Sequence, residues 1–299
     1  MTSSRPRRVL AFAAIAYALG TWPAAAVAQP SPTLVGIASA IVPGVGQAAL
    51  GEYGPAAAHF GVFAASLSAG LYYERKPDFL SDDQRYSSNS EFINQTTLRS
   101  DFALRLATDT ALYSSFAAYR DARARDDLSY RTPAPKETLS DLALAPFSLE
   151  FLARPTTFIP LALQAWAGSR KDSYAVFRAS DVSSGELHAH NVATSGFTAV
   201  GEEGFFRGFV NNELSNRWGD GWGLAGSSAL FGIAHNGQGD TANILQATIA
   251  GAYLGWVQQR NGFQIGEDVA LHFWFDFIAG FAAIRHGGSA QLVTFAIPF

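Results

Sequence analysis

The chain has 299 residues, of which 48% are hydrophobic and only 15% are charged. Soluble domains carry about 25% charged residues, so this deficit favours a membrane protein. The formal net charge of −4 excludes a strongly basic nucleic-acid-binding protein. Because cysteine is absent, disulfides and thiolate metal sites are also excluded. Any metal site would need histidine and carboxylate ligands.

The first 28 residues are typical of an export signal. Arg5, Arg7 and Arg8 form a positive region, residues 9–20 form a short apolar core, and residues 26–28 (AVA) fit a cleavage site. An uncleaved first membrane helix is the alternative. Either interpretation predicts a bacterial secretory route with the arginines on the cytoplasmic side.

Residues 29–136 are expected to form an N-terminal module of a membrane hairpin, a polar loop and a helix. The segment from Leu34 to Tyr73 is apolar but is interrupted by Gly/Pro-containing turns, which favours two short helices or a re-entrant hairpin. Residues 74–100 are polar and rich in turn formers, so we expect an exposed loop there.

The rest of this module contains one more helix and a linker. Residues 102–119 have helical periodicity and include Arg105 and Asp109, which suits an interfacial helix or a weak membrane span. Residues 121–136 mix both charges and end near two prolines. They predict a solvated linker at a module boundary.

The pattern of apolar and polar segments in residues 137–299 is typical of a helical membrane domain. An apolar segment at residues 142–166 contains three prolines, which predicts a broken helix, and a polar loop is expected at residues 168–186. Four apolar helical candidates follow: Val192–Val210, Trp222–His235, Ala242–Val257 and Val269–Ile284. The predicted fold class is therefore all-α, as a multi-pass transmembrane helical bundle.

Three short clusters place ionisable groups inside these apolar segments. They are EEGFFR at residues 202–207, FGIAH at 231–235 and HFWFD at 272–276. A charged group at bilayer depth costs about 2.5–3.5 kcal/mol on insertion scales. Such groups are expected where they meet in one water-lined site, so the clusters predict a functional site.

The spacing of the ionisable residues along each helix predicts that they have different surroundings. Residues four apart share a helix face, so Glu203 pairs with Arg207. Glu202 is left without a cation in apolar surroundings, which suits a general base that activates water. His272 and Asp276 share a face of the last apolar segment in the same way.

The residues alone are compatible with two mechanisms of hydrolysis, one with a metal ion and one without. Glu202, His235 and His272 fit a hydrolytic zinc set with water as the fourth ligand. The same residues also work without metal, because Glu202 and His235 can activate water while His272 and Asp276 stabilise an oxyanion. Each cluster alone is more often structural, and their joint occurrence in order is what favours a site. The other histidines are expected to be surface or packing residues: His59, His188, His190 and His286.

The ordered set Glu-Glu-x-x-x-Arg, Phe-x-x-x-His and His-x-x-x-Asp resembles the CPBP family of intramembrane proteases. That family includes the CAAX-prenyl endopeptidases of the Rce1 type and bacterial relatives linked to bacteriocin immunity. The likeness covers residues 142–284, within a protease domain expected at 137–299. It implies an α-helical membrane protease fold with the site inside the bilayer.

The resemblance also implies roles for the residues that match the motifs. Glu202 would activate water with the help of His235, and Glu203 and Arg207 would organise the site. His272 and Asp276 would bind the oxyanion or complete a metal shell. Many members have Asn where this chain has Asp276, and an ionised Asp cannot donate a hydrogen bond to an oxyanion.

We therefore expect an endopeptidase of the bacterial inner membrane that contacts lipid and cleaves a peptide or a membrane protein. Zinc, held by Glu202, His235 and His272, is the one cofactor considered. A prenylated substrate is not expected, because bacteria generally lack CAAX prenylation. The alternatives are a catalytically idle scaffold or immunity protein that keeps the family fold, and a proton-coupled transporter.

Overall fold

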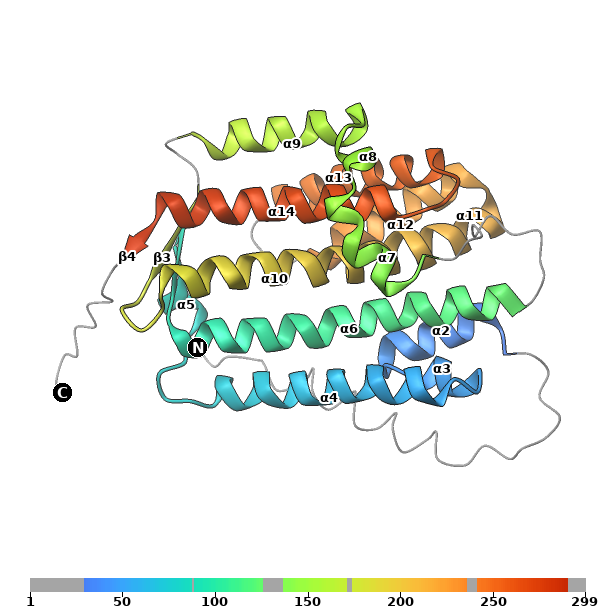
Figure 1. Ribbon diagram of the computed structural model, residues 1–299, viewed down its shortest axis with the longest axis horizontal. Helices are drawn as coiled ribbons and strands as arrows, with labels where there is room; N and C mark the ends of the chain where they lie inside the picture. The colour runs from blue at the N-terminus through green and yellow to red at the C-terminus, as the bar shows by residue number, and fades with distance from the viewer. Residues whose placement is uncertain (1–29, 88, 126–136, 171–173, 236–240, 290–299) are drawn as a thin grey trace.

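The predicted helical class is confirmed by the computed structural model, which adds one small sheet to a bundle of helices (Figure 1). The structure describes residues 30–87, 89–125, 137–170, 174–235 and 241–289. The predicted leader at residues 1–28 and most of the predicted linker lie outside the described residues.

The interrupted apolar segment near the N-terminus forms three helices rather than two. They are α2 (Pro32–Ile41), α3 (Val45–Ala49) and α4 (Tyr53–Glu74). Gly44, between α2 and α3, has φ of +91°, and an added Cβ would lie 2.3 Å from the carbonyl oxygen of Ala56. Only glycine fits this turn without strain.

The helix predicted over residues 102–119 is present as the longer helix α6 (Gln95–Arg125), which lies in the middle of the bundle (Figure 1). Its serines are buried because the N-terminal helices supply hydrogen-bond partners. Ser114 Oγ accepts from the N–H of Gly44 at 2.9 Å, and Ser115 Oγ donates to the carbonyl oxygen of Gly36 at 2.8 Å. Small polar side chains with partners can be buried at little cost.

The exposed loop predicted for residues 74–100 is wrong, because this segment contains α5 (Asp82–Arg85), β1 (Tyr86–Ser87), β2 (Ser90–Ile93) and the start of α6. The polar loop predicted after residue 168 likewise contains β3 (Ala175–Arg178). The sheet has the order β1-β2-β3-β4 and ends with β4 (Gly288–Ser289). β2 pairs antiparallel with β1 and parallel with β3, and β3 pairs parallel with β4. It therefore joins three distant parts of the chain at one end of the bundle.

The proline-containing segment is broken, as predicted, into α7 (Leu139–Leu144), the 3-10 turn η1 (Ala145–Phe147), α8 (Leu149–Leu152) and α9 (Pro155–Gly168). The four later helical candidates are also confirmed. They correspond to α10 (Ser184–Glu202) with the π-helix η2 (Glu203–Asn211), α12 (Asp220–Ala234), α13 (Thr241–Arg260) and α14 (Gly266–His286), and α11 (Asn212–Trp218) lies between η2 and α12. In the described part of the chain, no helix is both long enough and apolar enough to cross a bilayer.

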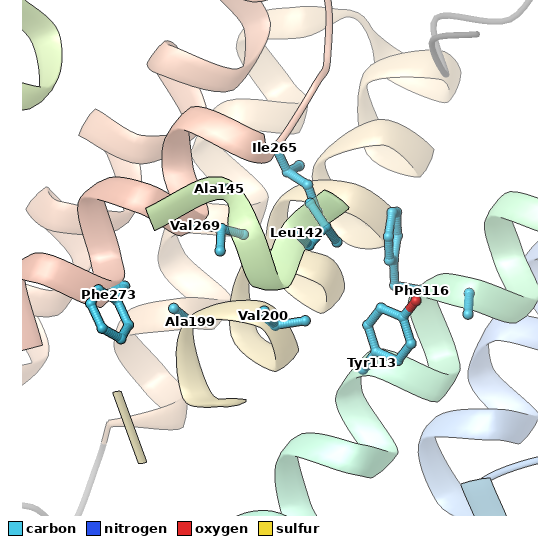
Figure 2. Packing of buried hydrophobic residues seen from close by; sticks show 10 residues of the cluster. Tyr113, Phe116, Leu142, Ala145, Ala199, Val200, Ile265, Val269 and Phe273 are labelled. Carbon is cyan, nitrogen blue, oxygen red and sulfur yellow. The ribbon is translucent and has the colours of Figure 1, made fainter. Parts of the chain in front are cut away.

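The main apolar core lies where α6, α10 and α14 meet the α7–η1 segment (Figure 2). Leu142 and Val269 are fully buried in it. The ring of Phe116 on α6 approaches η2 so closely that a Cβ added to Gly208 would lie 2.4 Å from it. α6 therefore fixes the position of η2, which begins at Glu203 directly after Glu202, the last residue of α10.

Candidate active site

A buried ion pair between Glu203 and Arg207 forms the base of the candidate site. Neither side chain is exposed, and Arg207 Nε lies 3.2 Å from Glu203 Oε2. Arg207 Nη2 also donates to the carbonyl oxygen of Gly251 on α13 at 3.4 Å, and its guanidinium lies 4.3 Å from the ring centroid of Phe231. The pair forms at the predicted spacing although the segment is a π-helix, a rare geometry that is frequent at functional sites.

His272 on α14 connects this ion pair to two further carboxyl groups. Its Nδ1 donates to Glu203 Oε1 at 2.6 Å. Its Nε2 lies 3.3 Å from Asp276 Oδ2 and 3.9 Å from Glu202 Oε2. We assign both ring nitrogens as donors, because each of them faces a carboxylate oxygen. The imidazole is thus bounded by three acids from two helices.

Glu202 differs from Glu203 in its surroundings, although the two residues are adjacent. Its side chain is 20% exposed, and its Oε2 is buried without a hydrogen-bond partner among the described residues. Glu203, in contrast, is engaged by Arg207 and His272. A carboxylate oxygen that is free beside an imidazole can accept a proton from a water molecule.

His235 at the end of α12 stands apart from this group. Its Nδ1 lies 2.8 Å from the carbonyl oxygen of Phe231, and the two rings are 4.5 Å apart. The ring of Phe231 lies 6.4 Å from that of His272. Within the described residues, His235 forms no hydrogen bond or ion pair with the other predicted site residues. Nδ1 donating to a carbonyl leaves Nε2 as the acceptor.

The side chains do not fit the zinc set considered from the sequence. The residues that the structure describes contain no group of three or more His, Cys, Asp or Glu side chains that could hold a metal ion. His235, one of the three ligands of that set, forms no hydrogen bond or ion pair with Glu202 or His272 among the described residues. No step of the reaction proposed below is therefore routed through a metal.

Two buried acids beside the site were not identified from the sequence. Asp109 on α6 accepts a hydrogen bond at 2.9 Å from Thr198, which lies one turn before Glu202 on α10. Asp268 is fully buried one turn before His272, and neither of its carboxylate oxygens has a hydrogen-bond partner among the described residues. The spacing of Asp268 to His272 was visible in the sequence, whereas the position of Asp109 depends on how α6 packs.

Comparison with protein families found a match to the model described as type II CAAX prenyl endopeptidase Rce1-like, at residues 187–278. The matched range starts within α10, ends within α14 and contains all six predicted site residues. Comparison with curated proteins and with solved structures found no match. Residues 187–278 are therefore similar to the Rce1-like type II CAAX prenyl endopeptidases, in agreement with the family that the ordered motifs resemble.

Proposed function

We propose that the protein is an endopeptidase that hydrolyses a peptide bond with a water molecule activated by Glu202. The arrangement that supports this proposal is the free Oε2 of Glu202 beside the Nε2 of His272. Glu202 accepts a proton from water, and the water oxygen attacks the carbonyl carbon of the substrate. His272 donates from Nε2 to the oxyanion, and Glu202 then returns the proton to the leaving nitrogen.

Asp276 and His235 have supporting roles in this proposal. Asp276 lies 3.3 Å from the imidazole of His272, so it orients the ring rather than donating to the oxyanion itself. His235 approaches from α12, where its Nδ1 contact with Phe231 fixes the ring and directs Nε2 as an acceptor. It assists Glu202 by accepting a hydrogen bond from the attacking water.

We place the enzyme in the bacterial inner membrane, with lipid against the outer faces of its helices. Large apolar side chains that are more than half exposed occur on α8, α9, α12 and α13: Leu149, Phe158, Trp166, Trp222, Ile233 and Ile249. Extensive exposed apolar surface marks membrane or partner contact. Arg5, Arg7 and Arg8 favour a secretory route with this segment on the cytoplasmic side. The substrate is proposed to be an unprenylated peptide or a segment of a membrane protein.

Substitution of Glu202 tests the proposal directly. The full chain in liposomes is incubated with quenched fluorescent peptides, and products are identified by mass spectrometry. We expect Glu202→Gln to lower kcat by about 10²–10⁴-fold, the range typical of a lost general base. Glu150→Gln is the matched control, since that carboxylate is 73% exposed and distant in sequence from the site. If the Glu202→Gln variant cleaves the peptides as fast as an active preparation of the natural chain, the proposal is wrong.

The same preparations separate the two alternatives. Proton-coupled transport that depends on Glu202, without any cleaved product, would favour a transporter. A folded protein without cleavage or transport would favour a scaffold or an immunity protein. His235→Ala tests the assisting role, because cleavage unchanged by this substitution would remove His235 from the reaction.

A further inference from the structure

A polar cavity of about 530 Å³ connects the small sheet to the candidate active site. It lies at the end of the bundle where α6, α10 and α14 approach the strands (Figure 1). Its volume falls within the range of about 300–1,000 Å³ that is usual for ligand sites. Asp276 is among the residues that line it, so the cavity reaches the residue that contacts His272.

The inner wall of this cavity combines polar side chains from α10 with small residues from α14. Asn191, Thr194 and Thr198 face it from α10, and Thr198 lies one turn before Glu202. Ala279 and Gly280 face it from α14. Gly280 lets the side chain of Asn191 pack against α14, because an added Cβ would lie 2.0 Å from Asn191 Oδ1. The amide of Asn191 and the hydroxyls of Thr194 and Thr198 donate to protein acceptors, and their oxygens can still accept hydrogen bonds from water or a peptide backbone.

One wall of the cavity is formed by residues that precede the matched domain. Arg85 pairs there with Glu91 and with Asp101. Arg105 also lines this wall, and it forms no ion pair within the described part of the chain.

His190 on α10 also lines the cavity, and its Nε2 is buried without a hydrogen-bond partner among the described residues. The sequence predicts a surface or packing residue at this position. Because Nε2 is inaccessible, this ring contributes packing to the wall and no polar contact to the cavity.

A second cavity, with more apolar walls, lies on the other side of α10. It has about 420 Å³ and lies among α4, α6, α7 and α14, where Val62, Leu106, Phe197 and Phe273 contribute apolar walls. Apolar cavities tend to stay dry, because a buried water needs two to four polar partners. Hydrolysis needs water, so the polar cavity is the better route to Glu202.

We propose that the polar cavity is the passage through which water and an extended peptide segment reach the active site, with one of its walls formed by the N-terminal half of the chain. This inference rests on the proposed peptidase function. It assigns Arg85, Glu91, Asp101 and Arg105 to the substrate passage. The N-terminal half is then part of the enzyme's binding site and not only an anchor.

The passage can be tested by thiol labelling, because the natural chain contains no cysteine. Thr194→Cys and Ala279→Cys place a thiol in the cavity, and Ala270→Cys places one at a fully buried position on the same helix α14. Each full-length variant in liposomes is treated with charged, membrane-impermeant methanethiosulfonate reagents of both signs. We expect the two cavity positions to react at least about tenfold faster than the control. Equal rates at all three positions would overturn the passage.

The labelled protein also tests the peptide part of the inference. Attachment of a bulky methanethiosulfonate adduct to Ala279→Cys is expected to lower kcat/KM for the fluorescent peptides at least about tenfold. The natural chain, which has no thiol, should be unaffected by the same reagent. Unchanged cleavage by the fully labelled variant would show that peptide does not use the cavity. Labelling requires no catalysis, so absent cleavage with rapid labelling would overturn the peptidase proposal and leave the water passage intact.

Discussion

His272 donates from Nδ1 to Oε1 of Glu203 across 2.6 Å, although 69 positions separate the two residues. The same carboxylate pairs with Arg207 one turn further along η2. One buried glutamate thus balances a guanidinium and orients the imidazole that faces Glu202. This relationship explains how two consecutive glutamates differ: Glu203 is held by two partners, and Glu202 keeps an oxygen free for chemistry.

Replacing Glu203 by Gln should destabilise the fold. The substitution leaves Arg207 fully buried without a compensating charge, so we expect the free energy of unfolding to fall by about 3–5 kcal/mol. Thermal and denaturant unfolding in detergent measure the loss. The control is Glu52→Gln, which removes the partner of the partly exposed Arg125 and should cost about 1 kcal/mol or less.

A double substitution separates stability from function at this pair. Glu203→Gln combined with Arg207→Met removes both buried charges and should recover much of the lost stability, because uncompensated charge is the main cost. Activity should not recover, since His272 still lacks its carboxylate partner. Similar losses from Glu203→Gln and Glu52→Gln would contradict the importance assigned to the buried pair.

The late helices and the site ion pair could be predicted because their signals are local. Apolar segments bounded by polar turns marked α12, α13 and α14 to within a few residues. The four-residue spacing also placed Glu203 beside Arg207. The contact of His272 with Glu203 is not local, and the sequence did not predict it: the ordered motifs predicted only that the three clusters meet in one site.

The sheet and the surroundings of Asp109 could not be predicted, because they depend on long-range packing. β2 is a short polar segment that pairs with β3 some 85 positions later, and no local alternation identifies such a partner. The sequence predicts an interfacial helix or a weak membrane span around Asp109. It is buried because Gly201 on α10 has no side chain: an added Cβ would lie 2.8 Å from the carbonyl oxygen of Asp109.

Glu137 should stabilise the start of α14, which carries His272. Its carboxylate accepts hydrogen bonds from the N–H of Ile265 at 2.9 Å and of Gly266 at 2.7 Å, and Ile265 provides no side-chain cap of its own. We expect Glu137→Ala to lower the free energy of unfolding by about 1–3 kcal/mol. Glu137→Gln should lose less, because its amide oxygen can still accept. A melting temperature unchanged by Glu137→Ala would show that the cap contributes nothing.

Chelation should leave the peptidase active. The described residues hold no cluster of three metal-binding side chains, and both ring nitrogens of His272 face carboxylates. We expect cleavage rates of the full chain to be the same before and after dialysis against EDTA and 1,10-phenanthroline. Metal content of the purified protein is measured in parallel. Loss of cleavage that is reversed by added zinc would contradict the metal-free mechanism.

Asp276 should tolerate Asn but not Ala. Its Oδ2 lies 3.3 Å from His272 Nε2, and the amide oxygen of Asn can accept from the same nitrogen. The amide also adds N–H donors that can reach an oxyanion, which suits the Asn found in many relatives. We therefore expect Asp276→Asn to keep kcat within about threefold, whereas Asp276→Ala lowers it about 10–100-fold, as lost orienting partners do. Peptide cleavage at saturating substrate measures both. If Asp276→Asn loses as much activity as Asp276→Ala, the negative charge itself is required, and orientation of the imidazole is not the role of this residue.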